Sequence, residues 1–402
     1  MTVVQINATC TVGSTGQICS AISRLLDRCG IENYILHTQP RGKHPRGIRY
    51  AGFLYVKGQA LRSRVRGCYG FNSRNATRRL LRKLDAIRPT LVHLHNLHGH
   101  NVHLGMLLMY LREKGIRTIW TFHDCWAFTA YCPHYDGIGC AQWKVGCRQC
   151  PLQHRFSWFF DCSRWLFDQK KEAIRGLDLT VVTPSVWLES QVKQSFFREY
   201  PVRVIRNGVD IDVFKPTASG FRKRYGLEDK RILLGVAYMW NRRKGIDVFE
   251  ALAERLEDTH RIVLVGVDPQ TEKRLSPHIL CLPRVHDATV LAQIYTAADV
   301  FINPTREEVW GLVNLEALSC GTPVVTFDTG GSPECVDDTC GIVVARDDVQ
   351  GLWESIRYVI TENPFSLEAC RARAKAFDAE IAFGEYLELY GSYDESITTK
   401  TI

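Results

Sequence analysis

The sequence predicts an α/β protein of two domains, each built on a parallel, doubly wound sheet. Short β-branched runs alternate with longer segments of helical periodicity, which is the pattern of repeated strand–helix units. The alternation pauses at a connection that ends in a proline, residues 205–216, and then starts again. A length of 402 residues with 45% hydrophobic content is enough for each of two domains to bury its own core.

The expected first domain covers residues 1–204, residues 205–216 form the linker, the second domain covers 217–375, and 376–402 form a terminal helix. Candidate strands of the first domain are 2–7, 34–38, 91–95, 117–122 and 179–182, with helical segments near 17–29, 73–86 and 102–114. Candidate strands of the second domain are 232–236, 261–265, 300–303, 324–327 and 341–344. Ligands of such sheets bind beyond the carboxyl ends of the strands, so we expect the site in a cleft between the two domains.

The start of the chain has neither the basic leader nor the long apolar core of a signal peptide, because its first apolar run ends at Ile6. No segment approaches the ~18 consecutive apolar residues of a membrane span. We therefore expect a soluble, cytoplasmic protein. Its fifteen cysteines are then mostly thiols, since a reducing compartment disfavours disulfides and the number is odd.

The most informative motif runs from Asn303 to Val325. A strand is expected to end before an acidic loop that carries Glu308, and a helix begins around Leu312 and stops at Gly321, which suits a C-cap. Glu316 lies just over a turn into this helix, so both glutamates can face one small volume. The helix N-terminus offers free N–H groups to a diphosphate. In isolation, two glutamates seven residues apart would more simply be a capping residue and a solvated one.

The motif is not isolated, and with its context the chain resembles the retaining glycosyltransferases of family 4. That family carries the same pair of glutamates, followed by a Gly-Thr-Pro-Val-Val strand like the one at Gly321. Further shared segments are 183–185, 207–210 and 243–245. The resemblance implies the GT-B fold, with two Rossmann-like domains that face a cleft. It also implies that the terminal helix packs back on the first domain.

The resemblance assigns roles to residues of the second domain. Glu316 is expected to bind the nucleotide ribose, Glu308 the donor sugar, and Arg243 and Lys244 the diphosphate that leaves. The other residues expected to contact the nucleotide are Asn207, Gly311, Leu312 and Val313. Cations and a helix N-terminus aimed at a departing diphosphate stabilise its developing charge, so the chemistry requires no metal cofactor.

Two departures from the family pattern stand out. Many relatives have Glu-Gly-Phe-Gly where this chain has Glu308-Val-Trp-Gly, so a side chain stands at Val309 in place of a glycine. An arginine that commonly lies five residues before the lysine is Met239 here. Arg242 or Arg243 would then take over its role, and we favour Arg243.

The first domain is expected to contribute a glycine-rich turn and a histidine to the site. Gly13 and Gly16 lie between the first strand and its helix, where glycines let the backbone approach a sugar or phosphate. The alternative is an ordinary strand–helix turn. His123 follows the strand at 117–122, and the resemblance implies a contact with the donor sugar near the reacting carbon. Five more histidines crowd the end of the preceding strand, and one or two of them are expected on the acceptor side: His93, His95, His98, His100 and His103.

An insertion at about residues 125–162 carries a cysteine cluster. Cys132, Cys140, Cys147 and Cys150 lie within nineteen residues, and the final pair has the C-x2-C spacing of a thiolate metal site. Four thiolates around a structural zinc ion would fold a loop that has little apolar content of its own. The alternative is a set of free thiols. A similar insertion occurs in family 4 enzymes that resemble colanic-acid and other exopolysaccharide transferases.

These observations predict a glycosyltransferase that moves a sugar from a nucleotide-sugar donor to a lipid-linked oligosaccharide acceptor in exopolysaccharide or surface polysaccharide synthesis. One alternative is a GT-B-like epimerase or phosphorylase. A zinc-containing nucleic-acid-binding protein is a weaker alternative, because aromatic residues are not interleaved with the basic stretch as a stacking platform requires. Nucleic acid is therefore not an expected partner.

The net charge of +8 is a difference between unlike regions. Residues 41–88 contain fourteen Lys and Arg and one acid, Asp85, which gives this segment +13 and leaves −5 for the rest. Such a cluster suits an anionic membrane surface, with each well-placed cation contributing up to about 1 kcal/mol. Val56, Leu61 and Tyr69 are candidates for shallow contacts with the lipid. The alternative is a solvated helical face.

Overall fold

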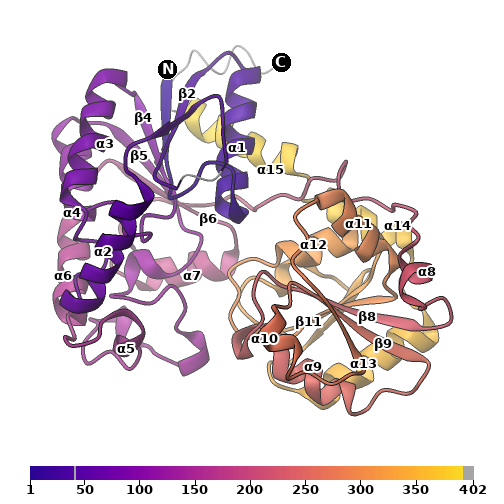
Figure 1. Ribbon diagram of the computed structural model, residues 1–402. Coiled ribbons are helices and arrows are strands. Elements are labelled where there is room, and N and C mark those ends of the chain that lie inside the picture. The colour runs from indigo at the N-terminus through magenta and orange to yellow at the C-terminus, as the bar shows by residue number, and fades with distance from the viewer. Residues whose placement is uncertain (40–41, 393–402) are drawn as a thin grey trace. The chain divides into compact units, whose positions relative to one another are not determined.

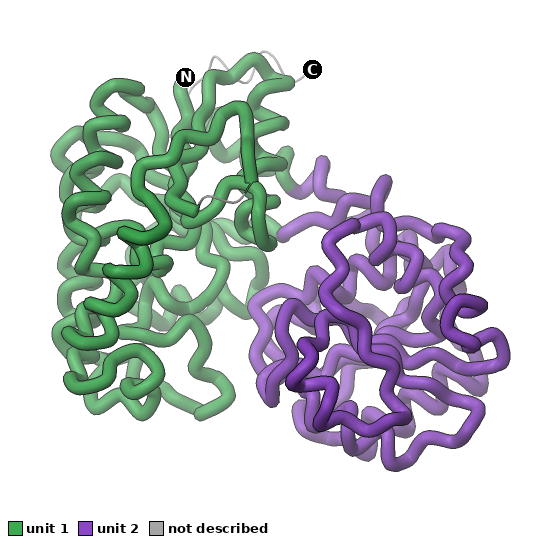
Figure 2. The backbone as a smooth tube through the Cα atoms, viewed as in Figure 1, with its two compact units in different colours: residues 1–206, 383–402 green, residues 207–382 purple. Residues whose placement is uncertain are grey.

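A computed structural model describes residues 1–39 and 42–392 of the chain. The chain forms two compact units (Figure 2). Unit 1 contains residues 1–206 together with the described residues from Phe383 onward, and unit 2 contains residues 207–382. Each unit has its own parallel sheet and its own helices, and each is described by itself.

Unit 1 is built on a seven-stranded parallel sheet in the order β3-β2-β1-β4-β5-β6-β7 (Figure 1). Its strands are β1 (Thr2–Ile6), β2 (Glu32–His37), β3 (Gly47–Arg49), β4 (Leu91–Leu94), β5 (Arg117–Thr121), β6 (Leu179–Thr183) and β7 (Val202–Val204). Its helices are α1 (Gly13–Arg28), α2 (Phe53–Arg66), α3 (Arg74–Ile87), α4 (Leu104–Glu113), α5 (Gln153–Phe156), α6 (Ser163–Ala173) and α7 (Val186–Gln194). The insertion adds the 3₁₀ turns η1 (Trp126–Phe128), η2 (Asp136–Ile138) and η3 (Gln142–Lys144).

Unit 2 is built on a six-stranded parallel sheet in the order β10-β9-β8-β11-β12-β13. Its strands are β8 (Arg231–Val236), β9 (His260–Val265), β10 (Ile279–Leu282), β11 (Val300–Asn303), β12 (Val324–Phe327) and β13 (Gly341–Val344). Its helices are α8 (Phe221–Tyr225), α9 (Ile246–Ala253), α10 (Pro269–Glu272), α11 (Ala288–Ala297), α12 (Leu312–Ser319), α13 (Val349–Glu362) and α14 (Leu367–Lys375). The 3₁₀ turns η4 (Arg242–Lys244) and η5 (Pro333–Cys335) complete it.

Both sheets reverse their strand order at one point, and these points locate the ligand sites of doubly wound folds. In unit 1 the reversal lies between β1 and β4, where Ile6 pairs with Leu94. In unit 2 it lies between β8 and β11, where Phe301 pairs with Leu234. The segments that leave the carboxyl ends of β1, β8 and β11 carry the candidate residues Gly13, Gly16, Arg243, Lys244 and Glu308, whereas His123 follows β5.

The last described helix, α15 (Ala379–Gly391), begins in unit 2 and ends in unit 1. Tyr390 hydrogen-bonds through its hydroxyl to His93 Nδ1 at 2.6 Å, and the Tyr386 hydroxyl lies 3.0 Å from Thr121 Oγ1. Both tyrosines are buried. The helix thus packs on β4 and β5 of unit 1.

Each candidate strand from the sequence corresponds to a strand of one of the two sheets, and the predicted two-domain α/β class is confirmed. The sequence analysis did not predict the strands β3, β7 and β10, nor the helices α2, α5, α6 and α7 of unit 1. β3 and β7 have three residues each at sheet edges, and β10 is the edge strand of unit 2. Helix α2 buries only Ser63, so it lacks the apolar stripe by which a helix is found in a sequence.

A buried lysine holds the start of the insertion of unit 1 through hydrogen bonds. Lys170 on α6 is 1% exposed, and its ammonium donates to the carbonyl oxygens of Trp126, Thr129 and Ala130 at 2.6, 2.9 and 3.2 Å. The same ammonium lies 3.5 Å from the centre of the Trp126 ring. The start of the insertion is therefore held by one side chain that satisfies three carbonyl groups.

Replacing this lysine should destabilise unit 1. Lys170→Met keeps the length of the side chain but leaves three carbonyl groups without their donor, at a cost of about 1–3 kcal/mol for each buried group left unsatisfied. We expect a loss of about 3 kcal/mol in the free energy of unfolding, measured by urea denaturation. The control is Lys171→Met, since Lys171 is exposed on the same helix and should change stability by less than about 0.5 kcal/mol. Equal effects of the two changes would contradict the structural role of Lys170.

Among the helices described, none combines the length and the apolar character needed to cross a bilayer.

Candidate active site

The candidate site of unit 2 lies where its strand order reverses. After β8 the chain forms η4, which carries Arg243 and Lys244, and Asn241 caps this turn by accepting a hydrogen bond from the Lys244 amide at 3.1 Å. After β11 the chain forms the acidic loop that carries Glu308 and then enters α12. Because β8 and β11 are neighbours in the sheet, two loops about sixty residues apart in sequence meet at one edge.

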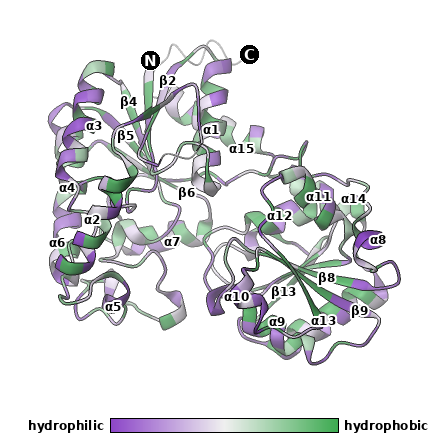
Figure 3. Cartoon of the chain, viewed as in Figure 1, coloured by the Kyte–Doolittle hydropathy of each residue, from purple (hydrophilic) through white to green (hydrophobic). Residues whose placement is uncertain are grey.

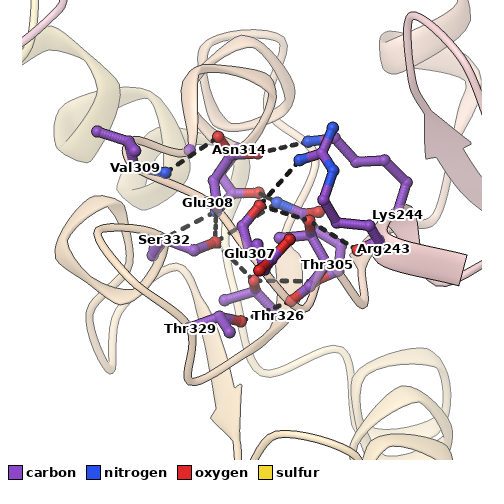
Figure 4. A network of polar contacts seen from close by, with 12 residues as sticks. Arg243, Lys244, Thr305, Glu307, Glu308, Val309, Asn314, Thr326, Thr329 and Ser332 are labelled. Atoms are coloured by element: carbon purple, nitrogen blue, oxygen red, sulfur yellow. Dashed lines mark hydrogen bonds and ion pairs between the residues drawn. The ribbon is translucent and has the colours of Figure 1, made fainter. Parts of the chain in front are cut away.

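The two loops meet through an ion pair between predicted site residues. Lys244 Nζ lies 2.5 Å from Glu308 Oε2, and both side chains are mostly buried, at 21% and 18% exposure (Figure 4). The other carboxylate oxygen accepts from the Val309 amide at 3.3 Å. A cation and a carboxylate are thus held side by side at the entrance to α12, and enough of each remains exposed to meet a ligand.

The neighbouring arginines of η4 have different environments. Arg243 turns toward the acidic loop, where its Nη1 donates to the Glu307 carbonyl at 3.1 Å (Figure 4). The Arg242 side chain is 87% exposed, with its Nε 3.8 Å from Asp247. Arg243 therefore lies beside Lys244 and Glu308, and Arg242 lies in solvent. Met239, which occupies the family's arginine position, is 60% exposed.

A third basic side chain, Arg306, fixes the acidic loop and was not found from the sequence. It makes a two-pronged ion pair with Asp247, at 2.8 and 2.9 Å, and its backbone amide donates to the Arg243 carbonyl at 2.8 Å. A further ion pair joins it to Asp347. Arg306 therefore serves to tie η4 to the loop after β11, so its charge is already neutralised within the protein.

A buried polar network holds the first turn of α12. Asn314 accepts from Asn303 at 2.8 Å and donates to the Ser332 hydroxyl at 2.9 Å, and that hydroxyl lies 2.9 Å from Thr326 Oγ1 (Figure 4). All four residues are buried. The network joins α12 to β11, β12 and the segment before η5, so the helix N-terminus has a fixed position.

The second glutamate of the motif has an altered acidity. Glu316 is half-buried, and burial raises its pKa from 4.5 to about 7, although the Tyr295 hydroxyl, which donates to it at 2.9 Å, lowers it. The carboxyl group is therefore partly protonated near neutral pH. An ionised Glu316 accepts hydrogen bonds from ribose hydroxyls, and a protonated one has lost part of that capacity.

This raised pKa makes a prediction about stability. A carboxyl whose folded pKa lies above its unfolded value favours the folded state fully below the unfolded pKa, and this contribution is lost as the pH rises through about 7. We expect the melting temperature of Glu316→Gln to rise relative to that of the unchanged protein between about pH 5 and about pH 8. Differential scanning fluorimetry across this range measures the effect. A difference that does not change with pH would contradict the raised pKa.

The other predicted nucleotide contacts also lie in unit 2. Gly311 is the residue before α12, and Leu312 and Val313 are the first residues of that helix, both half-buried. Asn207 accepts a hydrogen bond from the Trp310 indole through its carbonyl at 2.9 Å. Its side-chain oxygen is buried without a partner among the described residues. The contact between Trp310 and Asn207 therefore joins the motif to the start of unit 2.

In unit 1 the glycine-rich turn follows β1 at the reversal of strand order. Gly13 is the first residue of α1 and has a φ of +75°, which favours glycine. A methyl group on Gly16 would lie 2.6 Å from Thr9 Oγ1, so this position needs glycine to let the turn pack on the helix. Among the residues that the structure describes, no side chain caps the N-terminus of α1. The first amides of the helix are thus left to other partners.

His123 lies at the end of a hydrogen-bonded chain in unit 1. The Gln5 side-chain amide donates to the Cys19 carbonyl at 3.0 Å, which turns its oxygen toward His95 Nε2 at 3.2 Å. His95 Nε2 therefore carries the proton, and its Nδ1 accepts from His123 Nε2 at 3.1 Å. Burial lowers the pKa of His123 to about 4, so the ring is neutral at pH 7. The remaining nitrogen, Nδ1, is then a hydrogen-bond acceptor.

The crowded histidines divide into buried and partly exposed groups. His93 belongs to strand β4, His95 is the first residue after that strand, and both are buried. His98 lies near His123, because its Nε2 is 2.8 Å from the carboxylate of Asp124, the next residue in the chain. Although burial of Asp124 raises its pKa, His98 and its hydrogen bond lower that pKa to about 2 overall. Asp124 is therefore an anion next to the neutral His123.

The cysteine cluster of the insertion lines one small cavity. Cys132, Cys140, Cys147 and Cys150 all contribute to its wall, together with Trp143 and other residues. Burial raises the pKa of Cys132 and of Cys147 to about 12. Within residues 1–39 and 42–392, no three side chains of His, Cys, Asp or Glu are grouped so as to hold one metal ion. The zinc site stays a prediction, and metal analysis of the purified protein tests it.

Two family models match the chain. Residues 16–213 match Glycosyltransferase Family 4, and residues 230–362 match Glycosyl transferases group 1. The alpha-maltose-1-phosphate synthase of Mycolicibacterium smegmatis is 27% identical over 212 residues, which are 47% of this chain and 53% of that protein. The chain thus spans about half the length of the curated relatives that it matches.

Solved structures match almost the whole chain. The sucrose-phosphate synthase of Thermosynechococcus elongatus has a TM-score of 0.71 and 20% identity, and the match covers 98% of this chain and 99% of that one. The HepE protein of Anabaena, solved with UDP and glucose, has a TM-score of 0.69 and 14% identity, with 98% and 100% covered. At these identities the matches establish the fold, which is GT-B, with a Rossmann-like sheet in each unit.

Proposed function

We propose that this chain, which combines a family 4 and a group 1 glycosyltransferase domain on a GT-B fold, transfers a sugar from a nucleotide-sugar donor with retention of configuration. The observation that carries the proposal is the pairing of Lys244 with Glu308 at the point where the sheet of unit 2 reverses its strand order. HepE of Anabaena was solved with UDP-glucose, which supports a uridine diphosphate donor here.

In this proposal each residue acts on a stated part of the donor. Lys244 and Arg243 neutralise the diphosphate, and the N-terminus of α12 offers its amides to the same group. Glu308 binds hydroxyls of the donor sugar, and Glu316 binds the ribose. His123 contributes a neutral acceptor nitrogen from unit 1, which suits a hydrogen bond from a sugar hydroxyl. The chemistry requires no metal, because the cations already stabilise the leaving group.

The proposed reaction breaks the bond between the anomeric carbon and the diphosphate oxygen, and forms a bond between that carbon and an acceptor hydroxyl oxygen. The acceptor proton passes to the departing phosphate on the same face of the sugar. Retention in this scheme needs no pair of carboxylates about 5 Å apart, which retaining hydrolases use. No side chain of the site is therefore assigned as a nucleophile.

We propose a lipid-linked saccharide as the acceptor, in exopolysaccharide or surface polysaccharide synthesis. The excess of +13 over residues 41–88 supports this class of acceptor, because such a segment binds an anionic membrane surface at which a lipid carrier lies. The enzyme would then act at the cytoplasmic face of the membrane as a peripheral protein. The cysteine-bearing insertion, which is similar to that of colanic-acid-type transferases, supports the same pathway class.

A donor panel tests the proposal. The purified protein is incubated with nucleotide sugars and a lipid-linked acceptor, the products are measured by mass spectrometry, and the anomer is assigned by NMR. Transfer from one donor with retention supports the proposal, and inversion would overturn the mechanism. Product formed with phosphate alone would indicate a phosphorylase, and release of free nucleotide with an altered sugar would indicate an epimerase. Absence of thermal stabilisation by any nucleoside diphosphate would overturn the donor site.

A further inference from the structure

Unit 1 contains a pocket, lined by four arginines, that the proposed reaction does not use. Its volume is about 440 Å³. Arg62 and Arg66 reach it from α2, and Arg74 and Arg78 from α3. The remaining lining residues are neutral or aromatic, and none is acidic: Tyr55, Gln59, Cys68, Phe71, Asn72, Asn75, His103, Trp165 and Gln169. We call this cavity the arginine pocket.

The positive charge of the arginine pocket is not neutralised within the described part of the chain. None of the ion pairs between described residues involves its four arginines. Arg78 hydrogen-bonds only to an amide, Asn75, at 2.7 Å. The one acid of the basic segment, Asp85, pairs with Lys114 at 3.4 Å and accepts from the Tyr110 hydroxyl. Four exposed arginines therefore line one cavity, and a bound anion would lower their mutual repulsion.

The chemistry of the arginine pocket fits a phosphate group. A guanidinium presents a planar fork of donors that matches phosphate oxygens in pairs, and arginine keeps its charge at every physiological pH. A cavity of about 440 Å³ is within the usual range of roughly 300–1,000 Å³ for ligand pockets. It can enclose a phosphate or diphosphate with part of the group to which it is attached.

Exposed apolar side chains lie on α2, the helix that carries Arg62 and Arg66, and in a segment next to it, which favours a membrane lipid as the source of that phosphate. On α2, Leu54 is 82% and Leu61 56% exposed. Figure 3 shows that hydrophobic and hydrophilic residues are mixed along this helix. The segment 158–160, Trp-Phe-Phe, is also exposed, at 51%, 68% and 58%. Its Trp158 amide donates to the Arg64 carbonyl at 2.7 Å, so this segment adjoins the last turn of α2.

Helix α2 is not held by a core of its own. It buries only Ser63, and its exposed apolar residues alternate with Lys57, Arg62, Arg64 and Arg66. Helices that combine basic residues with exposed leucine and aromatic residues lie in the boundary between lipid headgroups and acyl chains. Tyr69, which the sequence suggested as a lipid contact, is buried and does not belong to this surface.

We propose that the arginine pocket binds the phosphate headgroup of an anionic membrane lipid, while Leu54, Leu61 and residues 158–160 insert into the headgroup boundary. The proposal deepens the proposed function by naming the lipid partner of unit 1. It does not depend on the donor chemistry, which belongs to unit 2. A pocket that recognises phosphate distinguishes between anionic lipids of equal charge, whereas a diffuse positive surface does not. This difference in lipid preference can be measured.

The test is a vesicle flotation assay with the full chain. Phosphatidylcholine vesicles contain either phosphatidic acid, with a terminal phosphate, or phosphatidylglycerol at the same surface charge. We expect tighter binding to phosphatidic acid, and a loss on the order of 100-fold in Arg62→Gln/Arg66→Gln/Arg74→Gln. The matched control, Arg79→Gln/Arg82→Gln/Lys83→Gln, removes the same charge from residues of α3 that do not line the pocket, and should lose no more than about threefold.

Two further measurements separate the outcomes. Leu54→Ser/Phe159→Ser should weaken binding to vesicles but leave the binding of inorganic pyrophosphate, measured by calorimetry, unchanged. Equal losses in the two triple variants, or no preference for phosphatidic acid, would overturn the pocket. Vesicle binding that is unaffected by Leu54→Ser/Phe159→Ser would overturn a membrane lipid as the source of the phosphate bound in the arginine pocket. Thermal stabilisation by nucleoside diphosphates should persist in every variant, so a failure here is distinct from a failure of the proposed function.

Discussion

Lys244→Ala should lower kcat/KM by roughly 100- to 1,000-fold, because one preorganised charge that stabilises a developing anion contributes about 2.7–4 kcal/mol to the barrier. The change also leaves the Glu308 carboxylate without the ammonium 2.5 Å away. Without that ammonium the carboxylate repels the diphosphate of the donor, so part of the loss in kcat/KM comes from this repulsion. The measurement is steady-state transfer with the donor that the panel identifies, together with the melting temperature as a check on folding.

The double variant separates these two components. In Lys244→Ala/Glu308→Gln the repulsion is absent, so affinity for a nucleoside diphosphate should recover in part while kcat stays low. Arg242→Ala is the matched control, because Arg242 lies in the same turn and its side chain is 87% exposed. It should keep activity within about threefold. Full activity in Lys244→Ala, or an equal loss in Arg242→Ala, would remove Lys244 from the site.

Gly330→Ala should destabilise unit 2 and displace Glu308. Gly330 has a φ of +56°, and a methyl group there would lie 1.6 Å from the Glu308 carbonyl oxygen. The Gly331 amide donates to the same oxygen at 3.2 Å, so the acidic loop and the segment after β12 are in direct contact. Overpacking and left-handed backbone together cost about 2–5 kcal/mol, and relief of the clash requires the loop of Glu308 to move.

The expected result for Gly330→Ala is a lower melting temperature together with loss of transfer, even at temperatures at which the variant is folded. Gly220→Ala provides the control, because a methyl group there has no atom within 4 Å and its φ is −81°. Gly220→Ala should change the free energy of unfolding by less than about 0.5 kcal/mol. A Gly330→Ala variant with unchanged stability and activity would show that the loop has more room than the structure gives it.

Most of the fold could be predicted from local pattern, and the exceptions have physical causes. Strands that are buried on both faces form apolar runs, which are visible in a sequence. β3 and β7 lie at sheet edges and have three residues each, so they carry little pattern. Helix α2 has no buried stripe, since its apolar residues face outward. Because α2 has no buried apolar face, the sequence pattern did not reveal it, and the same exposed apolar residues make it a candidate membrane contact.

Buried polar residues were the second class that the sequence did not reveal. Lys170 reads as a surface residue of an amphipathic helix, but it is 1% exposed and holds three carbonyl groups. Gln5 on β1 and His95, which directly follows β4, set the tautomer of His123, and no spacing in the chain connects them. Hydrogen bonds of this kind depend on which strands become neighbours.

The residues that carry the proposed chemistry, and the class of fold that holds them, are visible in the sequence. The spacing of Glu308 and Glu316 and the adjacency of Arg243 and Lys244 are local, so neither needs a folded chain to be seen. The folded chain is needed to see that Lys244 pairs with Glu308, that Arg242 lies in solvent, and that four arginines of α2 and α3 line one pocket. These contacts follow from strand order and helix packing, which the burial of apolar surface over the whole chain selects and no short segment specifies.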